Sequence, residues 1–585
     1  MSRNLMFSLT VSALSIGLIY TPAIASQQTA VVVEKFDQSL IRQTVQGPIL
    51  GVLENNNKTL SFLGVPYAQA PIGDLRWKSP KALNARENLL ATNKAPAVSL
   101  QVSKGKVTGS DDCLYLNIWR PNNNTKNLPV LVFLHGGNNQ TGSSTAASYG
   151  EFLAASANAV VVGLNYRLGP LGFIQIPALK HGTPEENSGN FTLLDINAGL
   201  DWVSANIANF GGDVKNITLA GHSAGGRDVM AILTSPKFKG KFHKAMAFSG
   251  GQTISDPLWA QSIHTKAFAK LAVEDKKQPS ETEAIKWLNT DSDEVRQWLY
   301  SIKSERLVSL MAGAKIRMRV FPHLFADGTV LPKEGMKVYD SPTTAKTVSD
   351  VPLLLLSDAT EFKFYCVTDP YFKTWVADNS VLTDKAKKSQ YSFAADYGSL
   401  FFGYANTQNS VERISQYTKS PIYVASFRWG TNSDIVGDEM AYLHGSKHGI
   451  HMDFLFNLKK FDLQKKYPQA YKNEGVNDLS HMLQSYVGNF LWTSNPNGQG
   501  LTQWQAWDTK NANGPTYLFM DSSLNKATAK MVNWKINPKQ LLNEMENDKS
   551  IPTERKNYLI KNVLDGRFFS YDIDKHFGNP NHIMP

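Results

Sequence analysis

Short apolar runs alternate with longer amphipathic segments along most of this 585-residue chain. The runs at 128–137, 158–167, 352–362 and 421–429 are almost continuously apolar, which is typical of strands buried on both faces. Residues 193–212 carry apolar side chains at helical spacing and end in two glycines. Because the segments between the strands are long, we expect an α/β fold with a mostly parallel central sheet, covered by helices on both faces.

A further strand, expected at 216–226, runs into a glycine-rich turn and then into a helix. The turn contains Gly221-His222-Ser223-Ala224-Gly225, a Gly-x-Ser-x-Gly pattern. Glycines without Cβ atoms allow a tight turn that lifts Ser223 clear of the sheet, and the helix start presents free N–H groups behind it. Strand, turn and helix in this order are the setting of a nucleophilic serine, and a purely structural glycine turn is the alternative.

The N-terminal segment has the features of a secretory signal peptide. Arg3 supplies a positive charge, residues 5–20 form an uncharged apolar stretch, and Ala23-Ile24-Ala25 is a small-residue cleavage site. We expect residues 1–25 to be removed after Ala25 and the protein to be secreted or periplasmic. Since the remaining chain has no apolar stretch of spanning length, we expect no stable membrane anchor.

Charge and cysteine content narrow the class of protein. The net charge of +10 results from 60 basic and 50 acidic residues, without a dense Lys/Arg run, so we expect no nucleic-acid partner. With only two cysteines, Cys113 and Cys366, an exported protein is expected to rely on its core rather than on disulfides.

The expected organisation is one large domain over residues 26–545. Within it, the region at about 370–420 is irregular and rich in aromatic side chains, typical of a helical flap packed on the sheet or of a substrate-pocket wall. Residues 546–585 are polar and charged and are expected to form a C-terminal extension, either a tail or an appended helix.

Eight ordered motifs over roughly residues 40–545 carry a resemblance to a known family. The chain resembles the type-B carboxylesterases, the group of α/β-hydrolases that also contains the cholinesterases. The resemblance implies the α/β-hydrolase fold and the hydrolysis of carboxylic esters. The motifs lie at 47–80, 109–121, 130–137, 161–173, 189–195, 206–226, 325–332 and 492–498.

The acid of the catalytic triad follows from this resemblance. The family's chain order is serine, then Asp or Glu, then histidine. Glu361, near the end of the segment at 352–362, occupies the acid position, although its neighbours differ from the family's pattern. Asp358, three residues earlier, is the alternative, because either carboxylate could orient an imidazole.

Three histidines compete for the role of general base. His448 matches the family's spacing after Gly445, whereas His444 and His451 are the alternatives. His451 stands where the family usually has Glu. Clustered histidines also raise a metal site, but His444 and His448 have no acidic third ligand close by in the sequence, so we expect neither a metal nor an organic cofactor.

The stretch after the strand at 128–137 resembles the glycine-rich loop that supplies oxyanion donors. The resemblance implies an oxyanion hole formed by the backbone N–H groups of Gly137, Asn138 and Ala224. Asn138 stands where a third glycine is usual, and Asn tolerates left-handed backbone better than most residues. The next residue, Asn139, replaces a usual aromatic or apolar residue.

The turn that carries Ser223, and the start of the helix after it, depart from the family's pattern at two positions. His222 replaces the usual Glu before the serine, which weakens the case for a cationic, choline-like substrate. Arg227 could attract an anionic group, and the alternative is a solvated cation at a helix start.

The resemblance also implies three structural features. It pairs Arg76 with Asp111 and Arg167 with Asp195 as ion pairs. Cys113 lacks its usual upstream partner, so we expect a buried thiol there.

The expected function is two-step hydrolysis of small to medium carboxylic esters by Ser223, His448 and Glu361. The partner is then a small-molecule ester. Two alternatives remain open at the level of the sequence. One is a related hydrolase acting on amides, polyesters or aromatic esters, and the other is a catalytically silent binding member of the family.

Overall fold

The structure is a computed structural model that describes residues 39–144, 149–310, 322–457, 462–511, 514–564 and 570–578. The predicted signal peptide, residues 1–25, lies outside these ranges. Among the helices in the described ranges, none is both long and apolar enough to cross a membrane.

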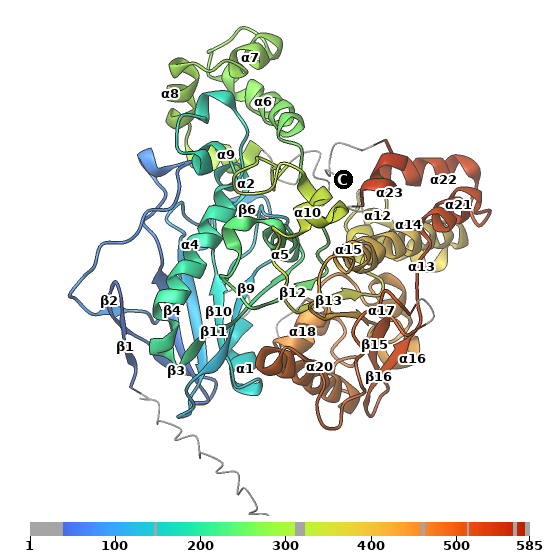
Figure 1. Cartoon of the computed structure of the whole chain (residues 1–585). Coiled ribbons are helices and arrows are strands. Elements are labelled where there is room, and N and C mark those ends of the chain that lie inside the picture. The colour runs from blue at the N-terminus through green and yellow to red at the C-terminus, as the bar shows by residue number, and fades with distance from the viewer. Residues whose placement is uncertain are drawn as a thin grey trace, which may run out of the picture.

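An 11-stranded sheet runs through the molecule (Figure 1). Its strand order is β16-β15-β14-β13-β12-β11-β9-β10-β8-β4-β3. The strands from β15 to β10 pair in parallel, and the strands on either side of them pair antiparallel. This arrangement confirms the predicted mostly parallel sheet. The parallel strands are β9 (Leu128–Leu134), β10 (Val160–Leu164), β11 (Gly212–His222), β12 (Lys244–Phe248), β13 (Leu353–Asp358), β14 (Ile422–Phe427) and β15 (Tyr517–Ser522). The flanking strands are β3 (Val52–Glu54), β4 (Thr59–Pro66), β8 (Tyr115–Pro121) and β16 (Ala527–Val532).

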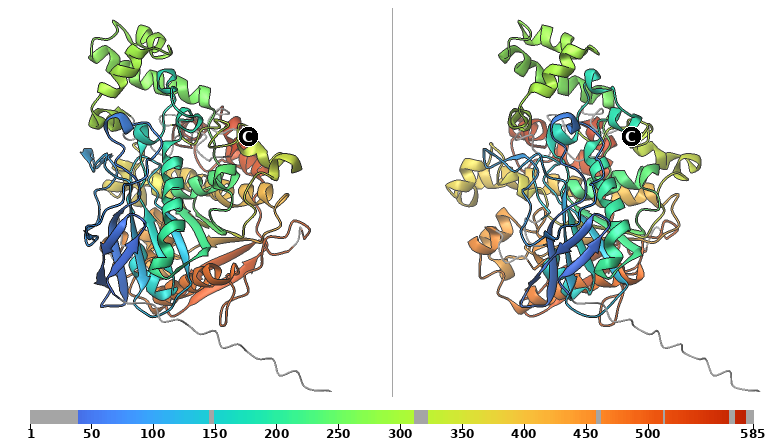
Figure 2. Two further views of the ribbon diagram at one scale, coloured as in Figure 1. Left: turned by 60° about the vertical axis from the view of Figure 1, so that its left-hand side comes forward. Right: turned by 90° about the vertical axis from the view of Figure 1, so that its left-hand side faces the viewer.

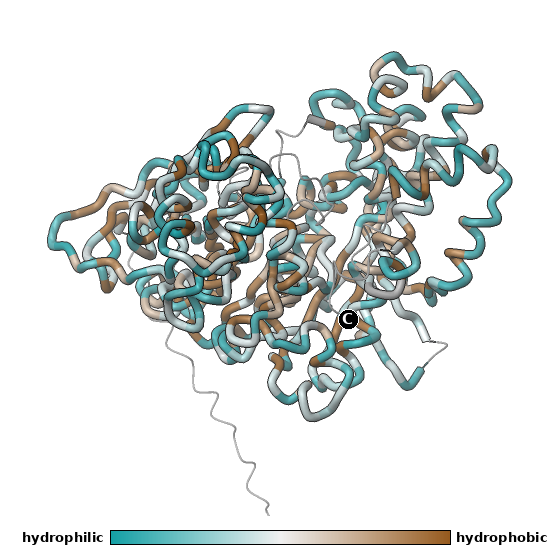
Figure 3. The backbone as a smooth tube through the Cα atoms, turned by 90° about the horizontal axis from the view of Figure 1, so that it is seen from above, coloured by the Kyte–Doolittle hydropathy of each residue, from teal (hydrophilic) through white to brown (hydrophobic). Residues whose placement is uncertain are grey.

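Helices cover both faces of the sheet, which explains why the central strands are apolar throughout. Alternate residues of β9 belong to different cores, since Val130 and Val132 pack on one face while Leu131 and Phe133 pack on the other. The first core includes α4 (Phe191–Asn206) and α5 (Ala224–Thr234), and the second includes α1 (Tyr149–Ser156) and α20 (Glu474–Thr493). Every residue of β9, β10, β12, β13 and β14 is buried. Viewed from above, hydrophilic segments predominate along the outer helices and loops (Figure 3).

Helices α6 (Pro257–Glu274), α7 (Glu281–Leu288) and α8 (Asp293–Ser301) project together from one end of the molecule (Figures 1 and 2). The aromatic region at about 370–420 is mostly helical, and its residues from Phe372 to Tyr404 form a separate layer with their own buried cluster. Its elements are α12 (Lys373–Ala377), α13 (Ser380–Thr383), α14 (Lys385–Gly403), the π-helix η6 (Tyr404–Gln408) and α15 (Asn409–Ile414).

The C-terminal segment packs on this layer rather than standing apart from it (Figure 1). Its helices are α21 (Pro538–Asn547), α22 (Thr553–Leu559) and α23 (Tyr571–His576). Leu541, Met545 and Leu559 share one buried cluster with Phe393 and Phe401 of α14. The apolar face of each short helix is therefore covered by the aromatic layer.

Buried charges and thiols follow the expected pattern with one difference. The predicted pair of Arg167 and Asp195 is confirmed, with 2.7 Å between Nη2 and Oδ1. Arg76 and Asp111 are instead linked through Ser304, whose hydroxyl accepts from the guanidinium at 2.8 Å and donates to the carboxylate. The motifs around Arg76 and Asp111 could not indicate Ser304, because it belongs to a distant segment of the chain. Cys113 and Cys366 are both free and buried.

Candidate active site

Ser223 occupies the turn between β11 and α5, in a backbone conformation that few residues adopt. Its φ is 57° and its ψ is −116°. The backbone N–H of Ser223 donates to the Phe248 carbonyl on β12 at 2.8 Å, which holds the turn against the sheet. The neighbouring glycine is required sterically, because a Cβ at Gly225 would lie 2.2 Å from the carbonyl oxygen of Leu134. Such strained backbone persists where the surrounding structure fixes it, and this is common at functional sites.

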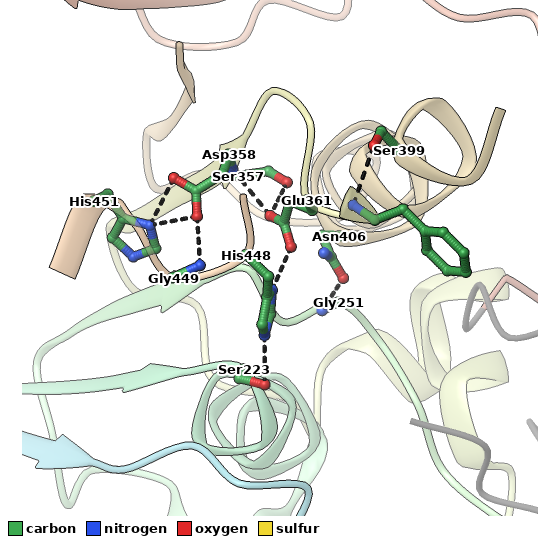
Figure 4. Close-up of polar contacts among 11 residues, drawn as sticks. Ser223, Gly251, Ser357, Asp358, Glu361, Ser399, Asn406, His448, Gly449 and His451 are labelled. Carbon is green, nitrogen blue, oxygen red and sulfur yellow. Dashed lines mark hydrogen bonds and ion pairs between the residues drawn. The ribbon is translucent and has the colours of Figure 1, made fainter. Parts of the chain in front are cut away.

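His448 lies in the loop between α17 (Asp438–Leu443) and α18 (His451–Leu455) and faces the serine (Figure 4). Its Nε2 is 2.8 Å from the Ser223 Oγ, and its Nδ1 is 2.5 Å from the Glu361 Oε2. Three residues from three separate segments thus form one continuous line of hydrogen bonds. Serine and histidine are each 8% exposed, so most of the line is shielded from water.

Glu361 follows β13 and is fully buried. Its second carboxylate oxygen accepts hydrogen bonds from the Ser357 hydroxyl at 2.5 Å and from the Asp358 backbone N–H at 2.9 Å. Burial alone would raise the pKa of Glu361, but the neighbouring His448 and the Ser357 hydroxyl hold that pKa below its usual value. The carboxylate is therefore ionised and fixed in orientation toward the imidazole.

Asp358, the alternative acid, serves a different histidine. Both of its oxygens approach the Nδ1 of His451, at 3.0 and 2.9 Å, and one of them accepts the Gly449 N–H at 2.7 Å (Figure 4). Burial raises the pKa of Asp358, although His451 opposes this effect. His444 lies against Tyr467 instead, with 5.7 Å between the ring centroids. The structure thus brings His448, and neither alternative histidine, into hydrogen-bond contact with Ser223.

His222 packs between the two other imidazoles beside the serine. Its ring centroid is 5.0 Å from that of His448 and 5.4 Å from that of His451. Burial, together with the positive charge that His448, His451 and Arg227 can carry, holds the pKa of His222 well below its ordinary value. A neutral imidazole therefore stands directly before the serine.

The glycine-rich loop after β9 faces the start of α5. Gly137 has a φ of +117° and Asn138 a φ of +56°, so both adopt left-handed backbone. Within the described part of the chain, neither the Gly137 N–H nor the Ala224 N–H donates a hydrogen bond to another residue. Backbone N–H groups that remain available near a serine hydroxyl can stabilise the negative charge that develops on the carbonyl oxygen during attack.

Side chains that the sequence did not point to complete the surroundings. The rings of Phe364, Tyr365 and Phe402 lie 5.7, 5.6 and 5.7 Å from that of His448. Phe402 belongs to α14, so the aromatic layer reaches the catalytic histidine candidate. Asp228 accepts a hydrogen bond from the Asn139 side chain at 2.8 Å. No local pattern marks such a contact, because the two residues are 89 positions apart.

The clustered histidines in the sequence also raise the question of a metal site. In the ranges that the structure describes, no group of three or more His, Cys, Asp or Glu side chains is arranged to hold a metal ion. His448 uses both ring nitrogens within the hydrogen-bonded line, and His451 uses Nδ1 for Asp358.

The chain is similar to several known esterases over most of its length. The pattern of the Carboxylesterase family matches residues 38–370. A liver carboxylesterase of Sus scrofa is 30% identical over 80% of this chain and 87% of its own length. A para-nitrobenzyl esterase of Bacillus subtilis is 28% identical over 79% of this chain and 92% of its own. A solved thermophilic para-nitrobenzyl esterase has a TM-score of 0.66 and 27% identity, covering 85% of this chain and 98% of its own.

These similarities confirm the expected α/β-hydrolase fold, because the related structures share the large, mostly parallel sheet with flanking helices. The chain belongs to the carboxylesterase family and is a carboxylic ester hydrolase.

Proposed function

We propose that the protein hydrolyses small to medium carboxylic esters with Ser223 as nucleophile, His448 as general base and acid, and Glu361 as the group that orients the imidazole. The observation that carries the proposal is the unbroken line from Ser223 Oγ through His448 to Glu361, with contacts of 2.8 and 2.5 Å. A serine hydroxyl becomes a strong nucleophile only when a base removes its proton during attack.

In the first step, Ser223 Oγ attacks the ester carbonyl and His448 Nε2 accepts the hydroxyl proton. The ionised Glu361 stabilises the imidazolium that forms. The oxyanion accepts hydrogen bonds from the N–H groups of Gly137, Asn138 and Ala224. His448 then protonates the leaving alcohol, which leaves an acyl group on the serine.

In the second step, His448 removes a proton from water, and the hydroxide attacks the acyl carbonyl. Collapse of the second oxyanion returns the proton to Ser223 and releases the acid. The chemistry uses only side chains and backbone N–H groups of this chain.

The environment of the serine supports uncharged or anionic esters over cationic ones. His222 is neutral, and Arg227 is a buried cation one helical turn away from the nucleophile. Cation recognition by a carboxylate beside the serine is therefore not part of this proposal. We further propose that the chain is exported and that residues 1–25 are removed, on the strength of the N-terminal sequence pattern.

The direct test is Ser223→Ala, assayed on a chain-length series of chromogenic esters. We expect kcat to fall by about 10⁴-fold or more for every ester, because the nucleophile is removed. Ser262→Ala, on the exposed surface of α6, is the matched control and should retain full activity. Near-normal hydrolysis by Ser223→Ala would show that another residue performs the attack.

A further inference from the structure

The loop that supplies the proposed oxyanion donors contains two consecutive asparagines in left-handed backbone. Asn138 has a φ of +56° and Asn139 a φ of +54°. Left-handed backbone is unfavourable for residues with a Cβ atom, even though Asn tolerates it better than most. Something outside the loop must therefore stabilise this conformation.

Two consecutive residues of α5 contact these two side chains. The Arg227 Nη2 donates to the Asn138 Oδ1 at 2.9 Å, and the Asn139 Nδ2 donates to the Asp228 Oδ1 at 2.8 Å. Asn139, Arg227 and Asp228 are 1%, 2% and 0% exposed. Because hydrogen bonds buried away from water are stronger than those exposed to it, the two contacts are well placed to hold the loop.

The same helix begins immediately after Ser223. Arg227 also donates its backbone N–H to the Ser223 carbonyl at 3.0 Å, so it belongs to the first turn behind the nucleophile. On the other side of the loop, the Asn139 carbonyl accepts the Gly169 N–H at 2.7 Å. The side-chain contacts thus connect the first turns of the helix that follows Ser223 to the loop that carries the Gly137 and Asn138 N–H groups.

We propose that Arg227 and Asp228 are positioning residues that clamp Asn138 and Asn139 and thereby fix the oxyanion donors relative to Ser223. This inference rests on the proposed function, because it takes the loop to be the oxyanion hole. Donors of this kind act on the oxyanion and stabilise the transition state more than the bound ester. Loosening the clamp should therefore lower kcat and leave KM nearly unchanged.

The test compares variants that remove each contact with variants that keep a polar group. Arg227→Met and Asp228→Leu remove the contacts, whereas Arg227→Lys and Asp228→Asn can still form them. We expect Arg227→Met and Asp228→Leu to lower kcat by roughly 10- to 100-fold and to change KM by less than about threefold. We expect Arg227→Lys and Asp228→Asn to retain most of the activity. Inhibition by a boronic acid, which forms a tetrahedral adduct on the serine, should weaken in proportion to the fall in kcat/KM.

A double-mutant cycle with Asn138→Gly isolates the clamp from any general effect of a buried substitution. Glycine accepts left-handed backbone without support, so in that background Arg227→Met should change kcat by less than about threefold relative to Asn138→Gly alone. Thermal melting identifies any variant that does not fold. If Arg227→Met does not fold, the Asp228→Leu and Asp228→Asn pair carries the same comparison for Asn139.

Three results would overturn the clamp. One is an unchanged kcat in both contact-removing variants, and another is an equal effect of Arg227→Met in the two backgrounds. The third is a higher KM confined to esters that bear a carboxylate, which would mean that Arg227 binds the substrate. Each of these is distinct from a failure of the proposed function, which is measured by Ser223→Ala alone.

Discussion

Two carboxylates only three positions apart in the chain, Asp358 and Glu361, serve two different histidines. Glu361 contacts His448, whereas Asp358 contacts His451. The pKa of Glu361 is lowered and that of Asp358 is raised, and the proximity of the two negative charges contributes to this separation. When the pKa values of two neighbouring acids are shifted in opposite directions, the two groups can take different roles. We infer that only Glu361 supports the base that activates the serine.

Replacing each carboxylate by the amide of the same size tests whether Glu361 and Asp358 have these different roles. Glu361→Gln keeps the size of the side chain but removes the charge that stabilises the imidazolium, and we expect kcat to fall by about 10⁴-fold. Asp358→Asn keeps an oxygen that can accept from Gly449 and His451, and we expect it to retain kcat within about tenfold. Steady-state kinetics on one activated ester measures both, and a larger loss in Asp358→Asn than in Glu361→Gln would reverse the assignment.

Sequence motifs pointed to Ser223, Glu361 and His448 because each stands at a characteristic distance from recognisable neighbours. They also showed that Asn138 and Asn139 were unusual for the loop. They could not show the partners Arg227 and Asp228, because a hydrogen bond between residues 89 positions apart leaves no local pattern.

At the scale of elements, the turn between β11 and α5 depends on close contact between backbones. A Cβ at Gly225 would lie 2.2 Å from the Leu134 carbonyl oxygen and 2.7 Å from that of His135. Neither backbone atom can move without shifting the end of β9 and the loop that follows it. The glycine thus sets the distance between the turn that carries Ser223 and the glycine-rich loop after β9.

Gly225→Ala should therefore destabilise the fold by about 1–3 kcal/mol and lower kcat, because overpacking displaces the adjoining loop. Gly403→Ala in α14 is the matched control. A Cβ there meets only the Ser357 Oγ at 3.9 Å, so this variant should gain about 0.5–1 kcal/mol in stability through higher helix propensity. Urea denaturation and ester kinetics compare the two, and equal stabilities would contradict the steric argument.

The strands could be predicted because burial on both faces makes them largely apolar, as in β9 and the first four residues of β13. The C-terminal helices could be predicted only in part. Their sequence is polar overall, and the apolar residues that pack on α14, such as Leu541 and Met545, are few and widely spaced. Whether the chain divides into one domain and an extension at residue 545 stays a prediction.

At the scale of the whole molecule, carboxyl groups beneath the surface make stability depend on pH. Burial raises the pKa of Asp453 to about 8, and the Tyr471 hydroxyl donates to this carboxyl at 2.9 Å. In the unfolded chain an Asp ionises at about pH 4. Between these two values the folded state binds the additional proton, so the contribution of this group to stability falls as pH rises.

Asp453→Asn removes this titration while keeping an acceptor for Tyr471. We expect the melting temperature of the variant, relative to the unmodified protein, to increase steadily from pH 5 to pH 8, reflecting at most about 1.4 kcal/mol per pH unit. Glu87→Gln, on the exposed surface, is the control and should show a flat difference. A flat difference for Asp453→Asn as well would mean that the carboxyl ionises normally in the folded protein.

The packing of α14 has a consequence for when the enzyme becomes active during its synthesis. The Ser399 hydroxyl of α14 accepts the N–H of Phe362, next to Glu361 (Figure 4). The Phe402 ring of α14 lies 5.7 Å from that of His448. Helices α21 and α22, which pack on α14, follow all of these residues in the chain. A nascent chain therefore contains Ser223, Glu361 and His448 well before the packing around them is complete. We expect hydrolytic competence to arise only after α22 has left the ribosome.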